Sequence, residues 1–120
     1  MTRVLLCDDS AQIRELVRTV LEHGGNEVVA EADNGLKAIE AAEREQPDVV
    51  LLDLSMPVMD GLEAMPEIRR VAPDARIVVL SGFDNRLLVA QALELGAVRF
   101  VVKGGDPSEI VGAVSEAGAA

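Results

Sequence analysis

Three aspartates lie where apolar runs of the chain end. Asp8 and Asp9 follow the run Val4–Cys7, and Asp53 follows the run Val49–Leu52. A carboxylate at the end of a buried strand is costly unless a counter-charge lies opposite it. Two such strands therefore predict a shared site for a divalent cation. Mg²⁺ suits the site, because it prefers one or two carboxylates, water and a phosphate oxygen as ligands.

Two more polar residues end the last two apolar runs. Ser81 follows Ile77–Leu80 and offers a hydroxyl donor, and Lys103 follows Val98–Val102 and offers a positive charge. Both groups can bind phosphoryl oxygens. An aspartate can attack a phosphoryl group to form an acyl phosphate, and Mg²⁺ can cancel charge at the attacking oxygen. If these strand ends meet, the chemistry indicated is phosphoryl transfer to a carboxylate.

Five short apolar runs rich in β-branched residues predict the strands that position this site. They are Val4–Cys7, Val28–Ala30, Val49–Leu52, Ile77–Leu80 and Val98–Val102. Segments of helical spacing alternate with them, and the first has a continuous apolar stripe at Ile13, Leu16, Val17, Val20 and Leu21. Strands that are apolar on both faces and alternate with helices indicate a covered parallel sheet. Right-handed crossovers then predict a three-layer doubly wound α/β domain with five helices.

Capping residues mark some of the helix boundaries. Ser10 can cap the first helix, and Gly96 suits the residue just beyond the end of the fourth. Pro66 conflicts with the third helical stretch. If that helix begins near Gly61, Pro66 removes an interior hydrogen bond and should kink it, whereas a later start would place Pro66 in the first turn.

The strand order decides whether the carboxylates meet. Ligands of doubly wound sheets bind at the carboxyl ends of the strands, where the strand order reverses. The order 2-1-3-4-5 puts this point between the first and third strands, which end in Asp8–Asp9 and Asp53. The fold would therefore bring together carboxylates that lie 45 positions apart (53 minus 8).

Composition limits the partners and the compartment. The chain has 120 residues, 49% of them hydrophobic, so we expect residues 1–120 to form a single domain with one core. A net charge of −10 and scattered basic residues argue against direct nucleic-acid binding. No apolar stretch approaches the ~20 residues of a membrane span, so we expect no membrane association. The single cysteine, Cys7, fits a reducing cytosol, and we expect a cytoplasmic protein.

Taken together and in order, these motifs resemble the receiver domain of two-component response regulators over essentially the whole chain. The matching segments are Leu6–Ser10, Leu51–Gly61, Val79–Gly82 and Phe100–Lys103. The resemblance implies a flavodoxin-like fold. It also implies that a sensor histidine kinase, or a phosphotransfer protein, donates a phosphoryl group from a phosphohistidine. The implied cofactor is Mg²⁺, for which Mn²⁺ can substitute.

The resemblance assigns a role to each residue of the acidic site. Asp53 is the phospho-acceptor. Asp53 and Asp9 ligate Mg²⁺ directly, together with the backbone carbonyl of Ser55, while Asp8 acts mainly through water. Lys103 binds the phosphoryl oxygens.

The resemblance also implies a switch. Ser81 binds the phosphoryl oxygens, and its movement toward them opens a space that Phe100 turns inward to fill. The face formed by the fourth helix, fifth strand and fifth helix then repacks, and a downstream effector domain or protein reads it. Ser55 and Phe83 occupy positions that tune the lifetime of the phosphoryl group. Dimerisation after phosphorylation stays open.

Two positions depart from the commonest family pattern. Gly104-Gly105 follows Lys103 where proline is usual, often after a cis bond. We expect a trans bond here and a looser loop, because a non-proline cis bond costs ~2.5–4 kcal/mol. The switch aromatic Phe100 lacks the hydroxyl that a tyrosine would offer to a partner.

Three other functions compete with this interpretation. A degenerate receiver would bind partners without phosphorylation; the intact set of site residues argues against it, whereas Gly104 keeps it open. A flavin carrier is disfavoured because the chain has no Trp and no Tyr. A phosphatase with an aspartate nucleophile needs a second aspartate where this chain has Ser55. We therefore expect a switch that catalyses only its own phosphorylation and dephosphorylation, not an enzyme with an external substrate.

Overall fold

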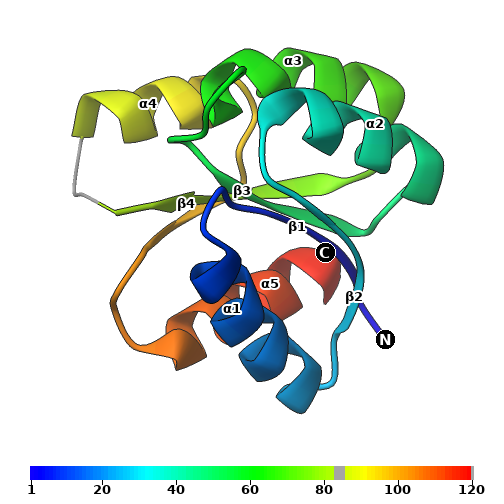
Figure 1. Ribbon diagram of the computed structural model, residues 1–120, viewed down its shortest axis with the longest axis vertical. Helices are drawn as coiled ribbons and strands as arrows, with labels where there is room; N and C mark the ends of the chain where they lie inside the picture. The colour runs from blue at the N-terminus through cyan, green and yellow to red at the C-terminus, as the bar shows by residue number, and fades with distance from the viewer. Residues whose placement is uncertain (83–85, 120) are drawn as a thin grey trace.

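A computed structural model describes residues 1–82 and 86–119 of the chain. Within them a five-stranded sheet alternates with five helices (Figure 1). The strands are β1 Arg3–Cys7, β2 Glu27–Ala32, β3 Val49–Asp53, β4 Arg76–Ser81 and β5 Arg99–Val102. The helices are α1 Ala11–His23, α2 Gly35–Glu45, α3 Gly61–Val71, α4 Arg86–Glu94 and α5 Pro107–Ala119. None of these helices is long and apolar enough to cross a membrane.

The strands are parallel and lie in the order β2-β1-β3-β4-β5, as the sequence predicts. α1 and α5 cover one face of the sheet, and α2, α3 and α4 cover the other (Figure 1). The register aligns the strand ends, since Cys7 pairs with Leu52 and Ser81 pairs with Val102. The order reverses between β1 and β3, so the predicted binding edge lies at their carboxyl ends.

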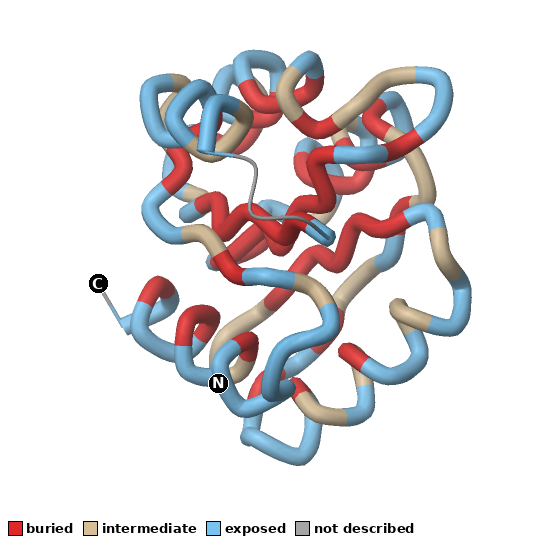
Figure 2. The backbone as a smooth tube through the Cα atoms, turned by 90° about the vertical axis from the view of Figure 1, so that its left-hand side faces the viewer, coloured by how far each residue is buried: buried red, intermediate tan, exposed pale blue. Residues whose placement is uncertain are grey.

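The hydrophobic core has two layers because successive side chains of a strand point to opposite faces. Leu52 packs in the layer under α2, α3 and α4, while Leu51 packs in the layer under α1 and α5. All five residues of β3 are buried. Figure 2 shows the same arrangement, with buried residues along the strands and on the inward sides of the helices. These layers hold the central strand ends in fixed positions.

Helix α3 begins at Gly61, so Pro66 lies inside it and the conflict found in the sequence is real. A capping box starts the helix: the Asp60 carboxylate accepts from the Glu63 N–H (2.8 Å), and the Glu63 carboxylate accepts from the Asp60 N–H (3.2 Å). Pro66 lies on the exposed side of the helix. Because Pro66 has no N–H for the Leu62 carbonyl, the helix lacks one interior hydrogen bond at this position.

The predicted stripe of α1 is only partly correct. Val17 and Leu21 are buried, but Leu16 is 52% exposed. The sheet and α5 cover Val17 and Leu21, which lie one turn apart on α1. Leu16 lies beside these two residues and is therefore left half exposed. The predicted boundary residues are confirmed: the Ser10 hydroxyl accepts from the N–H of Ile13 (3.3 Å), and Gly96 follows α4 with a φ of +111°.

Candidate functional site

The carboxyl ends of β1 and β3 bring the three aspartates together. One carboxylate oxygen from each of Asp8, Asp9 and Asp53 lies within 4.8 Å of the others. Asp8 is fully buried and Asp53 is 1% exposed, whereas Asp9 is exposed at the rim. Two buried carboxylates so close together repel each other, so the site needs positive charge.

Lys103 supplies positive charge to both buried carboxylates. Its Nζ lies 2.7 Å from Asp53 Oδ2 and 2.8 Å from Asp8 Oδ2. The backbone N–H of Lys103 donates to the Ser81 carbonyl (2.7 Å), which continues the pairing of β5 with β4 and aims the side chain along the sheet edge. No cis peptide bond occurs in the described residues, so the expected trans bond before Gly104 is confirmed.

Each buried aspartate uses its other oxygen to shape its own turn. Asp8 Oδ1 accepts from the Ser10 N–H (2.8 Å), and Asp53 Oδ1 accepts from the Ser55 N–H (3.0 Å). Asp8 Oδ2 is buried and forms no hydrogen bond of good geometry with any residue that the structure describes, despite its ion pair with Lys103. A buried carboxylate oxygen with unused acceptor capacity, beside two further carboxylates, fits a hard cation such as Mg²⁺.

The electrostatics of the site follow from this crowding. Burial raises the pKa of Asp53 above that of an ordinary aspartate, and the charge of Asp8 acts in the same direction; hydrogen bonds from Lys103 and Ser55 offset only part of this. Burial acts to lower the pKa of Lys103, but its contacts with Asp53 and Asp8 outweigh this and raise it. One ammonium shared between two carboxylates therefore holds these strand ends together.

An open cavity of about 560 Å³ lies over these residues. Five predicted site residues line it: Asp9, Asp53, Ser55, Ser81 and Lys103. Asp8 lies at the same strand ends, paired with Lys103. Phe100 is half-buried and packs against the core layer under α2, α3 and α4. Phe83 lies outside the described residues, so its predicted influence on phosphoryl lifetime stays a prediction.

Gly61 supports the site in a way that the sequence reading missed. A Cβ on Gly61 would lie 2.4 Å from the carbonyl oxygen of Asp53 and 2.9 Å from Cα of Leu54. Its backbone N–H also donates to the Leu54 carbonyl (3.2 Å). Helix α3 can therefore begin directly against the end of β3 only because this residue has no side chain. The sequence places a helix start only near Gly61, and the capping pattern of Asp60 with Glu63 is the signal that could have fixed this start.

Burial beside the acidic site should make the single thiol inert. Cys7 is fully buried, and burial together with the charges of Asp8 and Asp53 raises its pKa well above that of a free thiol. We expect a disulfide reagent to label native Cys7 at least about a thousandfold more slowly than the unfolded chain, because labelling must wait for unfolding. A variant that combines Cys7→Ser with Ser115→Cys carries its thiol at an exposed position of α5 and should react rapidly. Equally fast labelling of native Cys7 would contradict this account.

Comparison with known proteins gives a consistent result. The family model described as "Response regulator receiver domain" matches residues 4–115. The chain is 38% identical to the chemotaxis protein CheY of Thermotoga maritima over 95% of each chain. The receiver domain of the putative response regulator NarL from Mycobacterium tuberculosis superposes with a TM-score of 0.92 at 38% identity, covering 98% of this chain and 96% of that one. A CheX-CheY-BeF3-Mg complex from Borrelia burgdorferi contains a chain that is 27% identical, with a TM-score of 0.90, covering 96% of this chain and 87% of that one.

Proposed function

We propose that this chain, which belongs to the response regulator receiver domain family, accepts a phosphoryl group on Asp53 and so switches its binding surface. The donor would be a phosphohistidine on a sensor histidine kinase or on a phosphotransfer protein. One observation carries the proposal: Asp53 lines an open cavity while Lys103 Nζ lies 2.7 Å from its carboxylate. Residues 1–120 would form a single receiver domain, of which the family model matches residues 4–115.

The acidic cluster supports a Mg²⁺-dependent reaction. Asp9, Asp53 and the backbone carbonyl of Ser55 would hold Mg²⁺ or Mn²⁺ directly, and Asp8 would act through water. The bound cation would neutralise the clustered carboxylates and polarise the incoming phosphoryl group. This assignment agrees with the crowding of Asp8, Asp9 and Asp53 and with the unused acceptor capacity of Asp8 Oδ2.

The residues of the chain would then carry out the transfer. One carboxylate oxygen of Asp53 attacks phosphorus, the bond from phosphorus to the donor nitrogen breaks, and the imidazole leaves with its electron pair and takes up a proton. Lys103 stabilises the negative charge on the phosphoryl oxygens, and Ser81 donates a hydroxyl hydrogen bond to them. Attack of water on the acyl phosphate would later return Asp53 to its free carboxylate.

Partners would read the state of the site on the face formed by α4, β5 and α5. Ser81 ends β4, and Phe100 lies on the neighbouring strand β5 opposite Val79, two residues before Ser81. A shift at the end of β4 would therefore be passed to β5 along this strand pair. This face carries exposed apolar side chains at Leu87 on α4 and Val102 on β5. The Borrelia burgdorferi relative, in complex with CheX, BeF3 and Mg, supports a partner that binds such a state.

Intact mass measurement tests the proposal directly. After incubation with Mg²⁺ and a small acyl phosphate, we expect one phosphoryl adduct on the chain. Asp53→Asn and a metal-chelated sample should show no adduct. An adduct on Asp53→Asn would overturn Asp53 as the acceptor. If neither an adduct nor Mg²⁺-dependent binding of a beryllofluoride mimic is found, the chain is a phosphorylation-independent binding module instead.

A further inference from the structure

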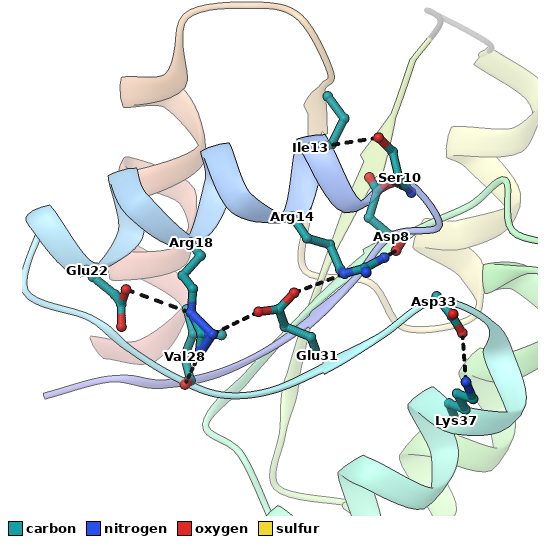
Figure 3. A network of polar contacts seen from close by, with 10 residues as sticks. All are labelled: Asp8, Ser10, Ile13, Arg14, Arg18, Glu22, Val28, Glu31, Asp33 and Lys37. Carbon is teal, nitrogen blue, oxygen red and sulfur yellow. Dashed lines mark hydrogen bonds and ion pairs between the residues drawn. The ribbon is translucent and has the colours of Figure 1, made fainter.

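An arginine on α1 holds the backbone of the loop that carries the acidic site (Figure 3). Arg14 Nη1 donates to the carbonyl oxygen of Asp8 (2.6 Å), and Arg14 Nε donates to Glu31 Oε1 on β2 (2.9 Å). We propose that Arg14, held in place by its ion pair with Glu31, is a positioning residue. It orients the metal-binding loop, residues 8–10 between β1 and α1. The inference rests on the proposed Mg²⁺-dependent function.

The carbonyl that Arg14 holds belongs to the peptide that joins Asp8 to Asp9. Because a peptide unit is planar, fixing its oxygen also fixes the direction of the Asp9 N–H and Cα. The neighbouring groups are held as well: the Asp8 N–H donates to the Ala32 carbonyl (3.0 Å), and Asp8 Oδ1 accepts from Ser10 (2.8 Å). Arg14 thus completes the set of contacts that fix the loop backbone. This backbone directs the buried carboxylate of Asp8 and the exposed carboxylate of Asp9 toward the same site.

Glu31 is suited to keep Arg14 in this geometry. Its other oxygen, Oε2, pairs with Arg18 Nη1 (2.8 Å), and Arg18 in turn donates to the Val28 carbonyl (3.2 Å). The side chains of Arg14 and Glu31 are only 18% and 29% exposed. The planar guanidinium can direct two N–H groups at two acceptors at once, which a lysine ammonium on a flexible stem does poorly. These contacts therefore depend on an arginine at this position and not on charge alone.

Charge and positioning predict opposite effects on the metal. A cation near a Mg²⁺ site repels the metal, so Arg14 acting through charge alone would weaken Mg²⁺ binding, and its removal would tighten it. If Arg14 positions the ligands, its removal weakens binding, as loss of outer-shell partners does at other metal sites, by about tenfold. The direction of the change in dissociation constant separates the two roles.

Calorimetric titration of metal-free protein with Mg²⁺ tests the inference without any phosphoryl donor. Arg14→Ala should raise the dissociation constant for Mg²⁺ about tenfold. Arg14→Lys, which keeps the charge, should also weaken binding, and Glu31→Gln should cause a smaller loss. Arg18→Ala is the matched control, because it removes a charge from the same helix and the same Glu31 pair but leaves the Asp8 carbonyl bound. It should keep the wild-type dissociation constant within about twofold, well below the outer-shell effect.

The outcomes distinguish this inference from the proposed function. If wild type binds Mg²⁺ and Arg14→Ala binds it equally or more tightly, the positioning role is overturned while the proposed function stands. If Arg18→Ala weakens binding as much as Arg14→Ala, the effect is general destabilisation and the inference is again overturned. Absence of Mg²⁺ binding by wild type would overturn both. Should Arg14→Ala fail to fold, circular dichroism will show it, and Arg14→Lys and Glu31→Gln carry the test.

Discussion

Replacing Lys103 with methionine should destabilise the metal-free protein by about 3 kcal/mol at neutral pH. The ammonium is the counter-charge of two buried carboxylates, at 2.8 Å from Asp8 and 2.7 Å from Asp53. Methionine keeps most of the side-chain volume but leaves both carboxylates facing each other without a cation. Urea unfolding followed by circular dichroism measures the change in the free energy of unfolding.

Acid and Mg²⁺ should each restore much of this lost stability. Burial already raises the pKa of Asp53, and loss of Lys103 raises it further. An aspartate whose folded pKa exceeds its unfolded pKa binds its proton more tightly when folded. Stability therefore falls as pH rises through the interval between the two values and returns as pH is lowered. Bound Mg²⁺ would replace the lost positive charge.

The matched control for this variant is Lys37→Met. Lys37 pairs with Asp33 at 3.4 Å, but both side chains are well exposed, so its removal should change stability little. Lys103→Met should also slow phosphorylation of Asp53 by about a hundredfold, because a charge aimed at the phosphoryl oxygens is lost. A Lys103→Met protein as stable as wild type at neutral pH, without metal, would contradict this view of the site.

Adding one methyl group at Gly61 should destabilise the fold by about 3 kcal/mol. The new Cβ would lie 2.4 Å from the carbonyl oxygen of Asp53 and 2.9 Å from Leu54 Cα. Both are backbone atoms, so relief requires α3 to move away from the end of β3, which carries the phospho-acceptor. Urea unfolding of Gly61→Ala measures the loss, and Mg²⁺ titration should show weakened binding at the same time.

Gly112→Ala offers a matched control for the glycine substitution. Gly112 lies in α5, and within 4 Å a Cβ there meets no described atom beyond its chain neighbours and the nearby helix backbone. Alanine is the better helix former by ~1 kcal/mol, so this variant should be neutral or more stable. If Gly61→Ala were also neutral, the close approach of α3 to β3 would not constrain the site.

The five helices and five strands could be predicted from the sequence because their signals are local. The alternation of β-branched runs with helical spacing depends on residues close together in the chain, and so do caps such as Ser10. The parallel sheet followed from general rules on crossovers. The meeting of Asp8 with Asp53 followed from the order 2-1-3-4-5, which is one of the two common orders of doubly wound sheets. The site residues could be identified in the sequence because a charged side chain at the end of a buried apolar strand is costly unless it has a function or a partner there.

Close contacts between elements could not be predicted in the same way. Periodicity indicates which side of a helix is apolar, but not how far a neighbour covers it, and so Leu16 was placed in the stripe although it is half exposed. Arg14 resembles any surface arginine until the loop geometry puts the Asp8 carbonyl 2.6 Å away. Likewise, the sequence does not show that α3 packs so closely against the end of β3 that a Cβ at Gly61 would meet the backbone.

The sequence by itself therefore determined the fold, the strand ends that meet and the residues available there. Only the tertiary structure decided that one ammonium bridges Asp8 and Asp53, that Arg14 and Glu31 hold the loop, and that Gly61 leaves no room for a side chain. The reason is one of scale. Strand pairing depends on the pattern of apolar residues, which does not change when an element moves by about an ångström. A hydrogen bond or a Cβ contact is formed or lost over that same distance.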